Sequence, residues 1–275
     1  CGLPGRALWV HNLNNRSELN GNNNDLHNNN GRVRGIAQHT SVFGHKNLMK
    51  TYRNLFERLC SLQNLELAFK KARKRKTLKP YVKEFETDLA EHLRRLSEEL
   101  TTKTYKPKPL NTFILRDPKT RRISVSDFRD RVVHHAICNV LEPIFESRFI
   151  HDSYANRKGK GVLAALKRFD EFKRKVSLNG RRVKGAHDAN IVRGFVLKAD
   201  IKHYFENVEH EKLLNVIGRT VKDKDVLGLI WKVICNHTSK ARGKGMPLGN
   251  LTSQFFANIY LNELDQFVKH TLKVK

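Results

Sequence analysis

The stretch Phe195-Val-Leu-Lys-Ala-Asp200, followed by Ile201 and then by Phe205, decides the fold that this sequence predicts. An apolar run that ends in a carboxylate is typical of a buried strand, and such a strand would deliver Asp200 to an edge where ligands can reach it. Hard divalent cations such as Mg²⁺ prefer carboxylate and carbonyl oxygens, so this position suits a metal ligand. The alternative is a loop aspartate that caps a helix over residues 208–214, and only the surrounding stretches separate the two interpretations.

The charge of the chain indicates a polyanionic partner. Its 275 residues include 53 Lys and Arg against 27 Asp and Glu, a net charge of +26. Nucleic acid is the simplest partner for such a protein, and a membrane surface is the rival. The sequence contains no apolar stretch long enough to span a bilayer, and no signal peptide opens it. Four scattered cysteines without a CxxC pair indicate neither a disulfide framework nor a zinc site, which favours a reducing, cytoplasmic location.

Residues 1–48 differ in composition from the rest of the chain. Ten asparagines lie between Asn12 and Asn30. So little apolar surface does not offset the entropy lost on ordering, and we expect this leader to be disordered or loosely attached. The chain begins with Cys1 and stops at Lys275 without a terminal signal, so we expect it to be a fragment.

Residues 49–108 are predicted to be helical. Pro80 is placed to open a helix at its first turn, and one apolar stripe follows it. The stripe consists of Val82, Phe85, Leu89, Leu93, Leu96 and Leu100. The basic run over residues 70–76 is either a solvated helix face or a phosphate contact.

Two short alternating runs, residues 112–115 and 122–125, predict a hairpin around a turn at 117–120. Basic residues surround its tip, which is either an ordinary soluble turn or a finger that grips phosphates. A helix preceded by Asp127 follows, with Val132, Val133, Ala136, Ile137, Val140 and Leu141 as its core positions. The adjacent His134 and His135 point about 100° apart on a helix, which argues against a shared metal.

Two glycine-bearing loops complete the pattern. Residues 151–161 form a polar, basic loop that lacks the Walker spacing of a P-loop. Residues 243–254 lead directly into a second predicted helix, whose apolar residues are Phe255, Phe256, Ile259, Tyr260, Leu264 and Phe267. Glycines let a backbone approach a ligand closely, and a loop of this kind at a helix start suits a phosphate or a nucleotide.

Taken together, these stretches resemble a reverse transcriptase of the group II intron, retron and diversity-generating branch. Four blocks in order carry the resemblance: residues 127–146, 149–161, 195–205 and 245–258. It covers residues 49–275 and implies an α+β fold, a right-hand polymerase fragment. Its parts would be a helical N-terminal region over 49–108, and fingers with a partial palm containing an antiparallel sheet over 109–275.

The fourth block narrows the resemblance. Intron and retron enzymes usually carry Gln-Gly, three residues and Ser-Pro, whereas here Leu248 replaces the Gln and Gln254 replaces the Pro. This is similar to the reverse transcriptases of diversity-generating retroelements, which copy a template RNA with errors at adenines. Loss of a polar group beside the incoming base relaxes discrimination, because binding separates near-isosteres by only about 1–3 kcal/mol. The asparagine-rich leader would then be a template repeat translated by read-through, with Met49 as the natural start.

The resemblance also implies the roles of single residues. Asp200 would bind two Mg²⁺ ions and the Ile201 carbonyl one of them, while Phe205 would lie under the sugar. Arg121 or Arg122 would neutralise the triphosphate, and the nucleotide pocket would include Leu248, Gly249 and Gln254. The residues expected to contact nucleic acid are Arg131, Arg157, Lys158 and Lys160.

The implied partners are template RNA, a DNA primer and its product, dNTPs and a basic accessory protein, with no membrane. The family also needs an aromatic-x-Asp-Asp motif, and this chain contains no Asp-Asp pair. We therefore expect these residues alone not to polymerise. One alternative is a group II intron or retron enzyme with an unusual fourth block, and another is a non-catalytic RNA-binding relative. Plain DNA binding through an unrelated helical fold would explain the charge but not the four ordered blocks.

Overall fold

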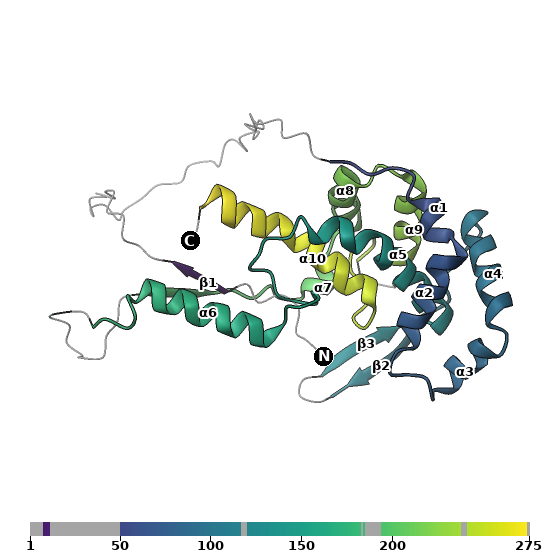
Figure 1. The fold of residues 1–275 in the computed structure, drawn as a ribbon, viewed down its shortest axis with the longest axis horizontal. Helices are drawn as coiled ribbons and strands as arrows, with labels where there is room; N and C mark the ends of the chain where they lie inside the picture. The colour runs from purple at the N-terminus through teal and green to yellow at the C-terminus, as the bar shows by residue number, and fades with distance from the viewer. Residues whose placement is uncertain are drawn as a thin grey trace, which may run out of the picture.

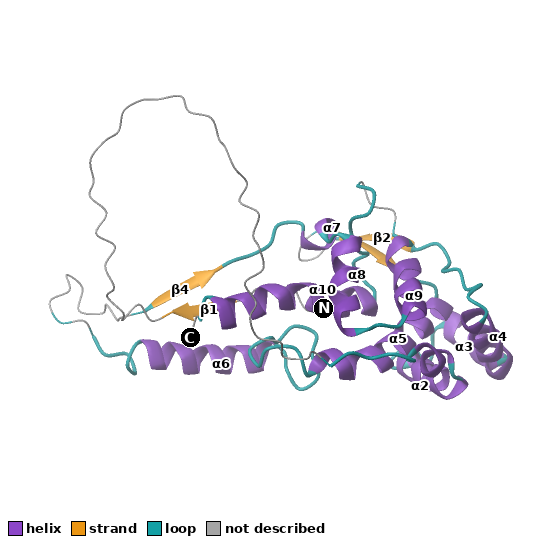
Figure 2. Cartoon of the chain, turned by 90° about the horizontal axis from the view of Figure 1, so that it is seen from above, coloured by secondary structure: helices purple, strands orange, loops and turns teal. Residues whose placement is uncertain are grey.

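The computed structural model describes residues 8–11, 50–116, 120–182, 184, 194–237 and 241–273. A helical body with a hairpin lies at one end of the molecule, and helix α6 beside a small sheet lies at the other (Figures 1 and 2). The body contains α1 (Phe56–Cys60), α2 (Leu62–Arg73), α3 (Pro80–Thr87), α4 (Leu89–Thr101), β2 (Asn111–Leu115), β3 (Arg121–Val125), α5 (Phe128–Glu146), α7 (Tyr204–Asn207), α8 (His210–Thr220), α9 (Lys224–Cys235) and α10 (Leu251–Gln266). The other end contains α6 (Val162–Val176), β1 (Leu8–His11) and β4 (Phe195–Lys198).

Helix α5 is the centre of the body and packs against α1, α2, α3 and α10. Asp127 caps its start by accepting a hydrogen bond from the Arg129 amide at 3.0 Å. The predicted core positions are confirmed, since all of the following are buried: Val132, Val133, Ala136, Ile137, Val140 and Leu141. His134 is also buried, and burial lowers its pKa to about 3, with smaller contributions from His135 and Arg131. The imidazole is therefore neutral inside the core.

The single helix predicted from Pro80 onward is two helices, and that expectation was wrong. The helical conformation is interrupted at Asp88, where φ is −133°. The break lets α3 pack on α5 while α4 packs on α2, so both halves of the apolar stripe are used. His92 stacks on Phe85 across the break, and its Nδ1 lies 3.0 Å from the Phe85 carbonyl oxygen.

The predicted hairpin is confirmed as β2 and β3, paired antiparallel with Phe113 opposite Ile123. Its expected tip at residues 117–119 lies outside the described residues. The side chains of β2 are exposed, whereas Ser124 on β3 is buried against the rest of the body. The hairpin is therefore anchored through β3.

The N-terminal helices and the later helices share one core. Tyr52 pairs with the corner between α8 and α9, donating its amide to Thr220 at 2.9 Å and accepting from the Lys222 amide at 2.8 Å. The Asp223 carboxylate accepts from the amides of Leu55 and Phe56 at the start of α1, at 2.7 and 3.0 Å. One contiguous cluster of apolar side chains runs from α1 to α10.

The strand β4 departs from the expectation of a buried strand. Phe195 and Leu197 are 63% and 65% exposed. Among the described residues β4 pairs only with β1, antiparallel, with Leu8 opposite Lys198. A sheet of two strands covers neither face fully, so the apolar side chains of β4 stay in solvent. Apart from Leu8–His11, the leader predicted over residues 1–48 lies outside the described residues.

The helix predicted after residue 254 is confirmed as α10, with a shorter buried stripe than expected. Leu264 and Phe267 are 43% and 48% exposed. The helix ends at Gln266 and gives way to a π-helical turn, η1 (Phe267–Thr271). Along the described part of the chain, no helix combines the length and the hydropathy needed to cross a membrane.

Candidate nucleotide-binding site

Residues 243–250, which we call the glycine strap, connect the hairpin to the segment that follows Asp200. On one side the strap lies against α7 and the start of α8. The Met246 amide donates to the Phe205 carbonyl and the Gly245 amide donates to the Val208 carbonyl, each at 2.8 Å. Phe205 follows Asp200 by five residues, so the strap is attached to the chain close after the candidate catalytic carboxylate.

His210 holds the same end of the strap from inside the body. It is 3% exposed, and its Nε2 lies 2.6 Å from the Gly245 carbonyl oxygen. A carbonyl only accepts, so Nε2 carries the proton and Nδ1 faces the Cys235 thiol at 3.8 Å. Sequence reasoning missed His210, because a lone histidine at a helix start gives no signal of a partner 35 residues away.

On the other side the strap is attached to β3. The Ser124 amide donates to the Leu248 carbonyl at 2.8 Å, and the Ser126 amide donates to Asn250 Oδ1 at 3.0 Å. Gly249 has φ +126°, and a Cβ there would come within 2.9 Å of the Ile123 side chain. Only glycine fits both the backbone angle and the close approach. The strap thus fixes Leu248 and Gly249 beside the hairpin.

The two hairpin arginines differ in their surroundings. Arg121 is half-buried and Arg122 is exposed. Burial, then Arg122 and His210, lower the pKa of His237, so the Arg122 charge acts on the end of α9. Both arginines are on β3, the strand to which the strap is hydrogen-bonded. Positive charge is therefore carried by the strand that borders the candidate nucleotide pocket.

Phe205 is supported by an aromatic contact. Its ring packs edge-on against Tyr204 with centroids 5.5 Å apart, and the Tyr204 hydroxyl donates to the Ala257 carbonyl at 2.8 Å. This pair fixes the short helix α7 on α10. Gln254, half-buried in the first turn of α10, is therefore on the same helix that supports Phe205.

Asp200 and Ile201 lie in the exposed segment between β4 and α7. The alternative in which Asp200 caps a helix is wrong, because His203 and Glu209 occupy the cap positions of α7 and α8. Ile201 borders a cavity of about 530 Å³ between α8 and α10, together with Tyr204 and Tyr260. The carboxylate and the carbonyl are oxygen donors of the kind Mg²⁺ prefers. Within the described residues, no cluster of three or more acidic, His or Cys side chains is arranged to hold a metal.

The residues expected to contact nucleic acid are mostly bound to the protein itself. Arg157, whose side chain is 7% exposed, donates to the Glu146 carboxylate and to the carbonyls of Ile150 and Ser153. Lys160 donates to the His151 carbonyl at 2.8 Å. Arg157 therefore organises its loop from within, an internal role that the basic composition of the loop did not indicate.

Of the other two, Lys158 is exposed and Arg131 is half-buried. Arg131 Nε donates to the Ser126 carbonyl at 2.8 Å, and its guanidinium stacks on Tyr81, 5.2 Å from the ring centroid. These two cations still face solvent in part, so they remain able to meet a phosphate.

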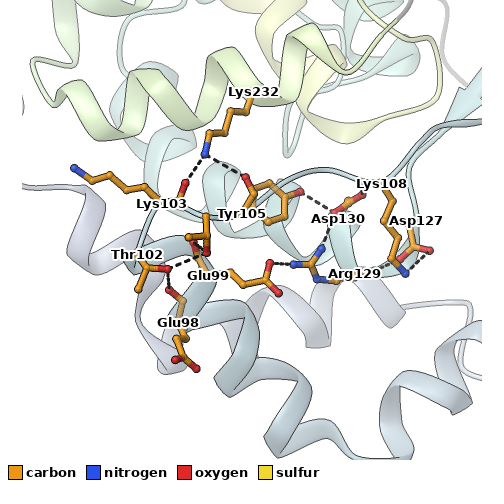
Figure 3. A network of polar contacts seen from close by, with 11 residues as sticks. Glu98, Glu99, Thr102, Lys103, Tyr105, Lys108, Asp127, Arg129, Asp130 and Lys232 are labelled. Atoms are coloured by element: carbon orange, nitrogen blue, oxygen red, sulfur yellow. Dashed lines mark hydrogen bonds and ion pairs between the residues drawn. The ribbon is translucent and has the colours of Figure 1, made fainter.

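A buried network fixes the linker that leads into the hairpin (Figure 3). Asp130 is fully buried and accepts from the Tyr105 hydroxyl and from the Lys108 amide, both at 2.8 Å. Burial raises the pKa of Asp130, opposed by these hydrogen bonds and by Arg129. Lys232 on α9 donates to the Tyr105 carbonyl at 3.2 Å. The linker is thereby held between α5 and α9, which sets where β2 begins.

Comparison with known proteins identifies one matching family and several similar proteins. The family described as "Reverse transcriptase (RNA-dependent DNA polymerase)" matches residues 106–275. Protein YkfC of Escherichia coli is 31% identical over 66% of this chain and 46% of its own length. The group II intron-encoded protein LtrA of Lactococcus lactis is 30% identical over 67% of this chain and 29% of its own. The chain therefore spans less than half of either relative.

Among solved structures, a "Partial Cas6-RT-Cas1--Cas2 complex" matches 77% of this chain and 34% of its own chain. The identity is 19% and the TM-score is 0.43.

Proposed function

Since the chain belongs to the reverse transcriptase (RNA-dependent DNA polymerase) family, we propose that it supplies the fingers and the first part of the palm of an enzyme that copies RNA into DNA. Residues 109–275 would form these parts, residues 49–108 a helical N-terminal region, and residues 1–48 a leader. The glycine strap is the observation that carries the proposal. It attaches the segment after Asp200 to the arginine-bearing strand β3, as a site for one nucleotide requires.

In this proposal the residues of the chain bind and orient the substrate. Arg121 or Arg122 neutralises the triphosphate, and Phe205 lies under the sugar. Leu248, Gly249 and Gln254 border the base pair. Asp200 and the Ile201 carbonyl would hold Mg²⁺, with the remaining ligands from other groups; two bound ions would stabilise the attacking and leaving oxygens. Template RNA, a DNA primer, dNTPs and a basic accessory protein are the proposed partners.

The test is primer extension on an RNA template by the protein expressed from its complete gene. Asp200→Asn keeps the shape of the side chain and removes its charge, so we expect extension to fall by at least about 10³-fold. The exposed Lys202→Gln in the same segment is the control and should retain extension. If Asp200→Asn extends the primer as well as the wild type, the catalytic role of Asp200 fails; if the wild type itself does not extend the primer, the polymerase proposal fails and the non-catalytic RNA-binding alternative takes its place.

Error-prone copying in a diversity-generating retroelement is the finer proposal. It is supported by Leu248 and Gln254, which replace the polar and proline positions of the intron pattern. Leu248→Gln should restore a polar partner for the base and lower misincorporation opposite template adenines by about tenfold, within the range of one lost contact. Sequencing of the cDNA measures this. An unchanged adenine error rate, or a wild type without such errors, would remove the finer proposal and leave the polymerase proposal intact.

A group II intron enzyme is the second candidate, and the identity to LtrA favours it. The two candidates differ in the RNA that they copy. The intron enzyme should extend a primer on an RNA from a flanking intron in preference to a repeat RNA, whereas the retroelement enzyme should prefer the repeat.

A further inference from the structure

One basic surface of the body lies outside the glycine strap and the hairpin, and it includes Arg131. It consists of Lys71, Lys76, Tyr81, Arg131 and His135, which we call the α2–α5 strip. Helices α2 and α5 lie side by side in both views (Figures 1 and 2). Lys71 is on α2 and Lys76 follows it, Tyr81 is on α3, and Arg131 and His135 are on α5. Arg131 and His135 are one turn apart on α5 and so share a face.

Hydrogen bonds connect the strip to the glycine strap. Arg131 Nε donates to the Ser126 carbonyl at 2.8 Å, and the Ser126 amide donates to Asn250 Oδ1 at 3.0 Å. Two hydrogen bonds through the buried Ser126 therefore link Arg131 to the glycine strap. From Arg131 to Asn139, where Lys71 is bonded, α5 advances about 12 Å, the length of about two nucleotides.

Two lysines, one on α2 and one just after it, act electrostatically on His135. Burial, then Lys76 and Lys71, lower the pKa of His135 to about 4. The imidazole is therefore neutral and offers an N–H or a lone pair, while the two ammonium groups supply the charge. Glu142 on α5 interacts electrostatically with Lys71 on α2. Its negative charge marks the end of the basic strip.

Not every cation of the run over residues 70–76 belongs to the strip. Arg73 pairs with Glu86 at 2.8 Å and packs over Phe69, so it serves the joint between α2 and α3. Lys71 is exposed and Lys76 is half-buried. Within the run over residues 70–76, Arg73 therefore has a structural role, whereas Lys71 and Lys76 are accessible to a phosphate.

Tyr81 adds a stacking surface at the end nearest the strap. It is 37% exposed, packs on Phe128 with centroids 5.7 Å apart, and carries the Arg131 guanidinium 5.2 Å from its centroid. An aromatic ring with a guanidinium plane beside phosphate-binding cations is the arrangement by which proteins hold single strands, because every base has a face that stacks.

We propose that the α2–α5 strip binds single-stranded RNA, with one base stacked at Tyr81 and Arg131 and about two phosphates at Lys71 and Lys76. It would form the outer part of the template path, so the inference rests on the proposed function. Duplex RNA does not fit the proposal, because its bases are already stacked on one another and are not presented to Tyr81.

The test is fluorescence anisotropy of the full chain with labelled oligouridine over a salt series. Lys71→Gln/Lys76→Gln should lower the magnitude of the slope of log K against log salt by about 1.4, since each phosphate contact contributes about 0.7 for a single strand. The matched control, Lys222→Gln/Lys224→Gln, removes the same charge at the α8–α9 corner and should leave the slope unchanged. Equal slopes for the two double variants would overturn the proposal.

Tyr81→Ala should weaken binding of oligouridine about tenfold at fixed salt, and Tyr81→Phe should bind as the wild type does, because stacking needs the ring and not the hydroxyl. On duplex RNA of the same length Tyr81→Ala should have no effect. An equal loss on both RNAs, or a loss in Tyr81→Phe, would overturn the stacking part. Because binding needs no chemistry, these results are independent of Asp200. Loss of binding in the strip variants, with no primer extension by the wild type, would leave the strip standing while the polymerase proposal fell.

Discussion

Asn250 is the residue through which the hairpin and the glycine strap meet. It is 4% exposed, lies at the start of α10, and its Oδ1 accepts from the Ser126 amide. Buried amides without a partner are costly, so the side chain at this position decides whether β3 can stay against the strap. This hydrogen bond joins two segments that lie 124 positions apart in sequence.

Replacing Asn250 should separate its hydrogen-bonding role from its size. Asn250→Ala leaves the Ser126 amide unpaired, and we expect the free energy of unfolding to fall by about 1–3 kcal/mol. Asn250→Asp keeps an acceptor oxygen at a helix N-terminus, where a negative charge is favourable, and should lose less. Urea denaturation of the two variants measures the difference. Equal losses would show that Oδ1 is not what matters.

Asp265 on α10 gives the fold a dependence on pH. Burial raises its pKa from 3.8 to about 6, opposed by Arg157. The folded protein then binds this proton more tightly than the unfolded chain does. The resulting stabilisation is present below pH 3.8 and is lost as the pH rises through about 6.

Asp265→Asn removes this titration. Between pH 3.8 and about 6 the wild type should lose on the order of 3 kcal/mol relative to the variant. Urea unfolding at several pH values in this window measures it, with Glu263→Gln as a control for the loss of one negative charge on the same helix. A wild type and an Asp265→Asn variant that change in parallel over the window would contradict the assignment.

At the scale of elements, the strap packs closely against the hairpin at one point, where Gly249 lies against Ile123. Gly249→Ala requires a side chain at φ +126° and places a Cβ 2.9 Å from Ile123, so the strap and β3 must move apart. We expect a loss of about 1–3 kcal/mol in the free energy of unfolding and faster hydrogen exchange at the Ser124 amide. Gly161→Ala is the matched control, because Gly161 has φ +120° but no neighbour within 4 Å. If the two variants lose the same stability, backbone strain alone accounts for the loss and the close approach does not.

The elements that sequence predicted best are those whose signals are local. The hairpin follows from two alternating runs, and the buried face of α5 follows from its apolar spacing. The break at Asp88 could not be predicted, because the apolar stripe continues through it and only the packing of α3 on α5 requires it. The exposure of β4 was missed for the same kind of reason, since a strand is buried by its neighbours and not by its own composition.

The sequence predicted residues for the candidate site, and their roles stay predictions; it did not predict how these residues are connected. Leu248 and Gly249 stand out as part of a glycine loop, but their bonds to β3 depend on tertiary contacts. Arg157 looked like a phosphate ligand because it lies in a basic loop. Its three internal acceptors, Glu146 and two carbonyls, come from the preceding turn and could be found only in the folded chain.

At the scale of the whole molecule, the body and the sheet of β1 and β4 differ in how they are held. The body shares one apolar core from α1 to α10, whereas β4 has exposed side chains and pairs with β1 alone among the described residues. The stability of the body should therefore not depend on β1. This separation also bears on whether Met49 is the natural start of the protein.

Removing residues 1–48 tests that independence. We expect the main thermal transition to move by no more than about 2 °C, because a change below about 0.5 kcal/mol shifts Tm by about that much in a domain of this size. The amides of Phe195–Lys198 should exchange faster, since β1 is their partner. Circular dichroism and hydrogen exchange measure the two effects. A large fall in Tm would mean that β1 belongs to the cooperative core, and the leader could then not be a dispensable read-through product.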